Sequence, residues 1–227
     1  CQAESALLCT RYRSESAGPG WSESIKPRNT PDSRLATTYG NFSMKNTALL
    51  VLDVPKGVVS HVSDATPYVQ RLAFVINAAR TQSIQIIHVK TAFRPGYPDL
   101  HPRNPSAQRV IPLGKYIEGD ESVEFHPTVA PHKEDIVTTK RRVSAFVGSD
   151  LEVTLRSSRI ENLVVVGLIA SGAALSTVRQ AADLDYGLTV LEGLCLDRDQ
   201  EVHELLMKKV IAKQANVVAS KEWLAGL

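Results

Sequence analysis

Short apolar runs alternate with amphipathic stretches along most of the chain, beginning at Thr47. Six of the runs are rich in leucine or in β-branched residues, and several are apolar at consecutive positions, which is typical of strands covered on both faces of a sheet. We expect strands at Thr47–Asp53, Ile84–Lys90, Ile136–Thr139, Asn162–Leu168, Leu188–Leu191 and Asn216–Ala219.

Four of the stretches between these runs have the features of helices. Thr66 can cap the first helix, with Pro67 at its first position. Its apolar side chains then form one stripe, made of Val69, Leu72, Val75, Ile76 and Ala79. We expect the other helices from about Ser149 to Arg156, from about Gly172 to Asp185, and from the N-cap Asp199 to about Lys209. This strand–helix alternation predicts one α/β domain with a mostly parallel sheet.

Residues 1–43 show neither helical nor alternating periodicity, and they are rich in Ser, Arg, Gly and Pro. Such a composition buries too little apolar surface to offset the entropy lost on ordering the chain. We therefore expect a flexible N-terminal extension over residues 1–43 and a single domain over residues 44–227, with Met44 as a candidate natural start.

Residues 91–135 form a second irregular stretch, which contains seven prolines and little periodicity. A loop of this length in a compact domain is usually a functional lid or an oligomer contact. A solvated surface excursion is the alternative interpretation.

Composition narrows the class of protein. The 227 residues are 43 % hydrophobic and 22 % charged, as in ordinary globular domains, and no run approaches the roughly 18 apolar residues of a membrane span. Three cysteines (Cys1, Cys9 and Cys195) cannot form a disulfide framework, and their scarcity suits a reducing, cytoplasmic compartment. The net charge of +2 is too small to indicate a nucleic-acid partner. From residue 47 onward, 20 basic and 20 acidic residues balance.

Candidate chemistry lies at the carboxyl ends of the predicted strands, where ligands bind in sheets of this kind. Asp53 closes the first strand, and Lys140 follows the third. The small-residue turn Gly167–Ala173 joins the fourth strand to its helix. The backbone N–H groups of such a turn, at a helix N-terminus, can hold an anion or an oxyanion.

These residues together resemble the isochorismatase-like hydrolases, the cysteine hydrolase superfamily that includes the nicotinamidases. The motifs are the strand-end Asp53, then Lys140-x-x-x-Ser-Ala-Phe, then Gly-Leu-Ile-Ala-Ser-Gly-Ala-Ala-Leu-Ser-Thr from Gly167. The segments Phe93–Pro98 and Ala181–Tyr186 are similar to one subgroup. The resemblance spans about Thr47 to Ser220 and implies a three-layer, Rossmann-like fold, with a six-stranded, mostly parallel sheet flanked by helices.

The resemblance also implies a site. The family's usual trio is Asp, Lys and a nucleophilic Cys; Asp53 and Lys140 match the first two, but the cysteine position falls on Ala173. A cis peptide is implied between Leu168 and Ile169, with the amides of Ile169 and Ala173 as oxyanion donors. Because alanine cannot form a thioester, we expect a subgroup that lacks the nucleophilic cysteine.

Three hypotheses follow. In the first, the chain hydrolyses a small molecule such as a vinyl ether, with Asp53 as a general acid that must stay protonated although Lys140 favours its carboxylate. In the second, the chain is a catalytically idle relative that serves as a binding or assembly module. In the third, it is an amide hydrolase in which an ionised Asp53 activates water directly.

Several other residues bear on specificity. The family often has Gln two residues after the strand-end Asp, where this chain has Pro55, which weakens the case for isochorismate itself. Arg94, Tyr97 and Arg103 are candidate anion contacts from the long loop, with structural roles as the alternative. Cys195 follows the fifth predicted strand, outside the nucleophile turn, and we interpret it as structural.

Asp99-Leu100-His101 matches the Asp-x-His pattern of the nicotinamidase metal motif, but it lies several residues further along the chain than that motif and has no obvious third ligand. We therefore expect no metal and no other cofactor. The expected partners are a small-molecule substrate and further copies of the chain in a homo-oligomer, with no nucleic acid and no membrane.

Overall fold

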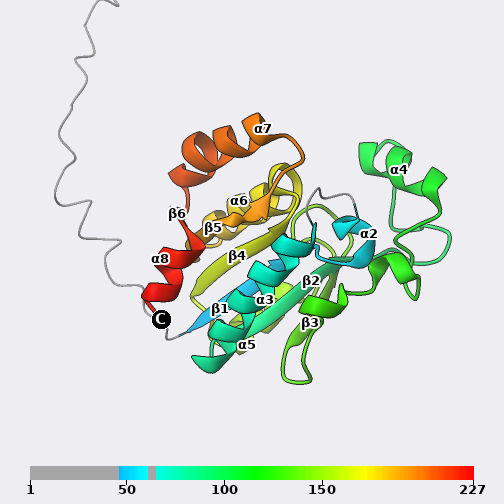
Figure 1. Cartoon of the computed structure of the whole chain (residues 1–227). Coiled ribbons are helices and arrows are strands. Elements are labelled where there is room, and N and C mark those ends of the chain that lie inside the picture. Colours follow the sequence, from blue (N-terminus) through cyan, green and yellow to red (C-terminus); the bar gives the residue numbers. More distant parts are fainter. Residues whose placement is uncertain (1–45, 61–64) are drawn as a thin grey trace, which may run out of the picture. The chain divides into compact units, whose positions relative to one another are not determined.

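A sheet of six strands forms the centre of the fold (Figure 1). The computed structural model describes residues 46–60 and 65–227, so the predicted extension over residues 1–43 lies outside the described part of the chain. Neighbouring strands are parallel throughout, in the order β3-β2-β1-β4-β5-β6. The strands are β1 (Thr47–Leu52), β2 (Gln85–Thr91), β3 (Ile136–Lys140), β4 (Asn162–Leu168), β5 (Gly187–Leu196) and β6 (Asn216–Val218).

The predicted strands are confirmed, and each begins within one residue of its expected start. The exception in length is β5, which continues to Leu196, so that Cys195 lies inside the strand and not after it. Glu192 and Gly193 interrupt the apolar run, and the register between β4 and β5 shifts at this place. The sequence pattern therefore ended the strand too early.

Helices cover both faces of the sheet and complete the three layers (Figure 1). On one face, side chains of α3 (Ala65–Thr81) and α8 (Ser220–Ala225) pack against alternate strand residues. On the other face, the core includes side chains of α5 (Leu151–Ser157), α6 (Leu175–Asp183) and η5 (Leu206–Val210). No helix of the described residues is long and apolar enough to span a membrane.

The predicted helices differ from the observed ones at their ends. Thr66 is already inside α3, which contains residue 65, so its assignment as the cap is wrong, whereas the predicted apolar stripe is buried as expected. Asp199 does cap α7 (Gln200–Leu205), because its side chain accepts hydrogen bonds from the amides of Glu201 and Val202. The last predicted helix continues beyond α7 as η5 and η6 (Ile211–Lys213).

Residues 91–135, expected to be irregular, contain four short helical elements. They are α4 (Pro105–Val110), η1 (Ile111–Leu113), η2 (Glu121–Val123) and η3 (Pro127–Val129). Phe93, Tyr97, Leu100 and Ala107 form a small apolar cluster of their own, which holds α4 on this segment. An isolated bridge between Phe93 and Ile117 ties the two sides of the excursion together.

The strand order reverses between β1 and β4, which places a crevice at their carboxyl ends. Gly167 makes this close pairing possible: a Cβ at this position would lie 2.0 Å from the carbonyl oxygen of Leu52, and its φ is +130°. The two neighbouring elements at this edge are α2 (Lys56–Val59) after β1 and the single-turn π-helix η4 (Ala170–Ala174) after β4. The crevice is thus bounded by the end of β1 and by the turn after β4.

Candidate functional site

A buried ion pair lies at the carboxyl edge of the sheet. Lys140, the last residue of β3, places Nζ 2.8 Å from Oδ2 of Asp53, which directly follows β1. Only 2 % of Lys140 and 8 % of Asp53 are exposed. Three neighbouring parallel strands, β3, β2 and β1, end at the same edge and bring the two side chains together.

In every hydrogen bond of this pair, the Lys140 ammonium donates or the Asp53 carboxyl accepts. The backbone N–H and the hydroxyl of Thr91 both donate to Oδ1 of Asp53, each at 3.0 Å. The Lys140 ammonium also donates to the carbonyl oxygens of Arg142 (3.1 Å) and Val143 (3.0 Å). The ammonium therefore has three acceptors, and the Asp53 carboxyl has three donors around it. This arrangement matches an ionised carboxylate, which accepts and does not donate.

The backbone at Asp53 is in the left-handed region, with φ of 46°. Asp and Asn adopt this conformation more readily than other residues with a side chain, because their short polar groups can bond locally. The conformation turns the chain out of β1, and the Asp53 amide donates to the carbonyl oxygen of Val89 in β2. The carboxylate thereby stays at the mouth of the sheet.

The turn after β4 forms the opposite side of the crevice. The peptide bond between Leu168 and Ile169 is cis, at the position that the family resemblance indicates. Ile169 and Ala173 both line the cavity described below, and 4 % of Ala173 is exposed. The first N–H groups of a helix have no partner within the helix, so this turn offers donors to a ligand.

Asp197, which directly follows β5, braces this turn. Its Oδ2 accepts a hydrogen bond from the Ser171 amide at 2.6 Å, and its Oδ1 accepts one from the Arg198 amide at 2.8 Å. Burial raises the pKa of the Asp197 carboxyl, but the hydrogen bonds from Ser171, Arg198 and Asp199 outweigh this effect and hold the pKa below its usual value.

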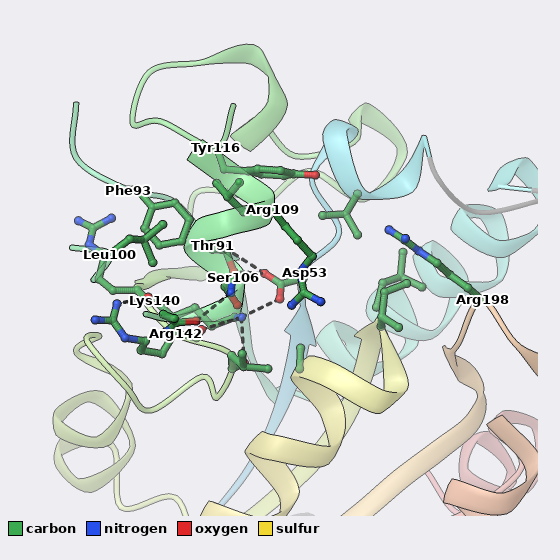
Figure 2. A pocket seen from close by; sticks show the side chains of 18 residues that line it. Asp53, Thr91, Phe93, Leu100, Ser106, Arg109, Tyr116, Lys140, Arg142 and Arg198 are labelled. Atoms are coloured by element: carbon green, nitrogen blue, oxygen red, sulfur yellow. Dashed lines mark hydrogen bonds and ion pairs between the residues drawn. The ribbon is translucent and has the colours of Figure 1, made fainter. Parts of the chain in front are cut away.

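A cavity of about 300 Å³ opens directly beside Asp53 and Lys140 (Figure 2). Five of its lining residues lie at the carboxyl edge of the sheet, and we call them the floor: Asp53, Thr91, Lys140, Ile169 and Ala173. The 91–135 segment supplies much of the remainder, through Phe93, Leu100, Asn104, Ser106, Arg109, Val110 and Tyr116. This segment is therefore a wall of the candidate site.

Three predicted anion contacts lie elsewhere. Arg94, Tyr97 and Arg103 are absent from the cavity wall. The guanidinium of Arg94 pairs with Asp99, and the Tyr97 hydroxyl donates to the carbonyl oxygen of Lys115 at 2.8 Å. Arg94 and Tyr97 therefore have partners within the 91–135 segment itself.

The other flagged residues have structural partners. Pro55 is buried as the N-cap residue of α2, away from the cavity wall. Cys195 is fully buried; its Sγ donates to the carbonyl oxygen of Val165 at 3.4 Å, and burial raises the pKa of the thiol to about 12. A neutral, enclosed thiol of this kind is not a nucleophile. Within residues 46–60 and 65–227, no group of three or more potential ligands is arranged to hold a metal ion.

Comparison with known proteins identifies the family. Residues 47–222 match the model of the isochorismatase domain. The chain belongs to the isochorismatase family. An uncharacterized isochorismatase family protein of Bacillus subtilis, YwoC, is 25 % identical over 81 % of this chain and 95 % of its own length. The ureidoacrylate amidohydrolase RutB of Acinetobacter baylyi is 28 % identical over 73 % of this chain and 77 % of its own length.

Solved structures agree with the fold of this isochorismatase family member. An isochorismatase family protein from Burkholderia thailandensis matches with a TM-score of 0.72 at 24 % identity, covering 80 % of this chain and 95 % of the other. At this identity, the likeness concerns the fold alone. The three-layer α/β architecture that the sequence predicts is thus shared with known isochorismatase structures.

The cavity residues that sequence reasoning missed include Thr91, Arg109, Tyr116 and Arg198. Thr91 and Arg198 follow from the same rule that selected Asp53, because Thr91 ends β2 and Arg198 is the second residue after the end of β5. Arg109 and Tyr116 carry no such signal. Their positions depend on the path of the 91–135 segment, which no local pattern specifies.

Proposed function

We propose that this member of the isochorismatase-like hydrolases cleaves an amide or a related acyl bond in a small molecule, using a water that Asp53 activates. The observation that carries this proposal is the hydrogen bonding of Asp53. Its partners among the described residues, Thr91 and Lys140, all donate to it, which favours the carboxylate that a general base requires. The name of the amidohydrolase relative gives independent support for an amide bond.

The proposed reaction has two steps. Asp53 takes a proton from water as the water oxygen attacks the carbonyl carbon, and the carbonyl oxygen becomes an oxyanion that accepts hydrogen bonds from the amides of Ile169 and Ala173. The tetrahedral intermediate then breaks its carbon–nitrogen bond, and the proton passes from Asp53 to the departing nitrogen. The products are a carboxylic acid and an amine or ammonia.

Ala173 fits this scheme through its size. It lines the cavity at the position where the resemblance puts the family's nucleophilic cysteine, and a methyl group leaves room there for a water. A thioester route needs a thiolate, which this position lacks. We therefore assign the chain to members that work without that cysteine.

Vinyl-ether hydrolysis is the second candidate function, favoured by the space at Ala173. It requires a protonated Asp53, and so it requires Lys140 to turn from Asp53 to a carboxylate of the substrate. The two routes have opposite pH dependence: activity rises with pH when Asp53 is the base and falls with pH when Asp53 is the acid. The idle-module alternative would be favoured by an Asp53–Lys140 pair without a cavity, whereas this pair borders about 300 Å³ of space.

The test is release of ammonia from a panel of small primary amides, alongside release of pyruvate from isochorismate. We expect ammonia from at least one amide, and we expect Asp53→Asn to lower kcat by roughly 10²- to 10⁴-fold because the general base is lost. Asp183→Asn, a change at an exposed aspartate of α6, serves as the control and keeps the activity.

A variant that introduces the family's cysteine tests the same site by a gain of function. Ala173→Cys is expected to add a thiol-dependent amidase activity to that of the wild type, and a thiol-alkylating reagent should remove the added part. Unchanged ammonia release in Asp53→Asn contradicts the base assignment. Pyruvate release without ammonia release from any amide replaces the amide proposal with the vinyl-ether route.

A further inference from the structure

The cavity concentrates positive charge that the rest of the domain does not have. From residue 47 onward, 20 basic and 20 acidic residues balance. Of the eighteen residues that line the cavity, five are basic and Asp53 alone is acidic. This excess marks the cavity as a site for negatively charged molecules.

Three of the five cationic side chains are already engaged. Lys140 pairs with Asp53, as described above. Arg141 donates to Glu118 and to the carbonyl oxygen of Ala92, and Arg142 donates to the carbonyl oxygen of Arg141 at 2.7 Å. These groups stabilise the protein's own structure, so their charges are less available to a ligand.

The guanidinium groups of Arg109 and Arg198 are in a different situation. Within the part of the chain that the structure describes, neither has a hydrogen bond or an ion pair to a protein group. In Figure 2 they enter the cavity from different sides, Arg109 from the 91–135 segment and Arg198 from the chain that follows β5. Two unpaired guanidinium groups therefore border the same space as the Asp53 carboxylate.

The backbones of both arginines are fixed. Arg109 lies in α4, whose N-cap Asn104 accepts a hydrogen bond from the Ser106 amide at 2.9 Å and whose Ala107 is buried in the small apolar cluster. The Arg198 amide is bound to Asp197. Preorganised positions of this kind lower the entropy that is lost when a ligand binds.

We propose that Arg109 and Arg198 form a two-point anion clamp, which selects small molecules that carry two separate carboxylate groups. A guanidinium binds a carboxylate through two parallel N–H···O bonds, and the two arginines stand on different sides of the cavity. The apolar side chains of Phe93, Leu100 and Val110 line the same cavity and suit a short carbon skeleton. The claim that such a molecule is a substrate, and not only a ligand, rests on the proposed hydrolase function.

Binding measurements test the clamp without any need for turnover. The probes are glutarate, which has two carboxylates, butyrate, which has one, and inorganic phosphate, which places its charge on a single group. Each is titrated by calorimetry into the wild-type chain, Arg109→Gln, Arg198→Gln and the control Arg71→Gln, an exposed arginine of α3 outside the cavity.

The clamp predicts that glutarate binds at least about tenfold more tightly than butyrate. Butyrate lacks the second carboxylate, and the loss of a charge-assisted hydrogen-bonded contact weakens binding by about this factor. Each cavity variant should lose that preference, and Arg71→Gln should retain it. Failure of glutarate to bind, equal affinity for glutarate and butyrate, or a preference that survives both cavity substitutions would overturn the proposal. Tighter binding of phosphate than of glutarate would also overturn it, and would indicate a site for one multiply charged group instead of two separate carboxylates.

The anion clamp and the proposed hydrolase function can fail independently of each other. If the glutarate preference holds and no amide is cleaved, the clamp stands and the hydrolase proposal fails. If amides are cleaved with equal efficiency whether or not they carry carboxylates, the hydrolase proposal stands and the clamp fails.

Discussion

The floor of the cavity and its rim, by which we mean Arg109 and Arg198, differ in whether their charged groups are buried and paired. In the floor, Asp53 and Lys140 are almost fully buried, and their polar atoms have protein partners. At the rim, Arg109 and Arg198 are exposed, and their guanidinium groups have no partner among the described residues. A buried charge destabilises the fold when its partner is removed, whereas an exposed, unpaired charge is available to a ligand. Substitutions in the floor should therefore alter stability as well as activity, and substitutions at the rim should alter binding alone.

The largest effect on stability is expected from breaking the floor pair on one side. Lys140→Met leaves the Asp53 carboxylate buried without its cation, which typically lowers the free energy of unfolding by about 3–5 kcal/mol. Urea unfolding followed by circular dichroism measures this change. The double variant Asp53→Asn/Lys140→Met removes both charges and should recover part of the loss. A Lys140→Met variant as stable as the wild type would remove the distinction between floor and rim.

The second prediction separates the effect of pH on stability from its effect on activity. His88 in β2 is fully buried, and its Nε2 lies 3.4 Å from Oδ2 of Asp135. Burial lowers the pKa of His88 to about 4, although Asp135 acts in the opposite direction. Between pH 6.5 and about 4 the unfolded chain therefore binds a proton that the folded chain does not, so stability falls as the pH falls through this range, by on the order of 3 kcal/mol.

Unfolding free energies measured across this pH range check the effect. His88→Leu should flatten the pH dependence of stability, and the control His101→Leu, at an exposed histidine, should leave it unchanged. If stability does not depend on His88 in this range, the assignment of a neutral, buried imidazole is wrong.

The third prediction concerns Asp197, which contacts both regions. Its carboxylate holds the Ser171 amide in the turn beside the floor and the Arg198 amide at the rim. Asp197→Ala removes both acceptors and should cost roughly 1.5–3 kcal/mol of stability, as for hydrogen bonds to a charged group. It should also lower kcat and raise KM together, which steady-state kinetics measure. A change in KM alone would show that the turn does not depend on this brace.

The smallest effect on stability is expected at the rim. Arg109→Gln and Arg198→Gln remove exposed groups without protein partners, so their unfolding free energies should stay within about 0.5 kcal/mol of the wild-type value. Thermal or urea unfolding provides the measurement. A larger loss for either variant would mean that its guanidinium supports the fold, and the contrast with the floor would then not hold.

The parts of the molecule that the sequence predicts well are those fixed by local pattern. Buried parallel strands are nearly continuous apolar runs, so the pattern predicts all six, and the rule of the carboxyl edge points to Asp53 and Lys140. The end of β5 was missed because Glu192 and Gly193 break its pattern.

The rim could not be predicted from local pattern. Arg94 and Arg109 lie in the same proline-rich segment and look alike in the sequence, but Arg94 pairs with Asp99 whereas Arg109 faces the cavity. What separates them is the path of the segment, which depends on the bridge from Phe93 to Ile117 and on the apolar cluster under α4. Such long-range contacts leave no periodic signal in the sequence.

A single turnover in water labelled with heavy oxygen tests most directly whether water attacks the substrate without a covalent enzyme intermediate. The measurement uses enzyme in excess over the best amide substrate, followed by mass spectrometry of the acid product and of the proteolytic peptide that contains Asp53. Direct attack by water predicts that the label enters the acid product in the first turnover and that the Asp53 peptide stays unlabelled. Label in the Asp53 peptide, with an unlabelled product, would identify Asp53 as a covalent nucleophile and contradict its assignment as the base.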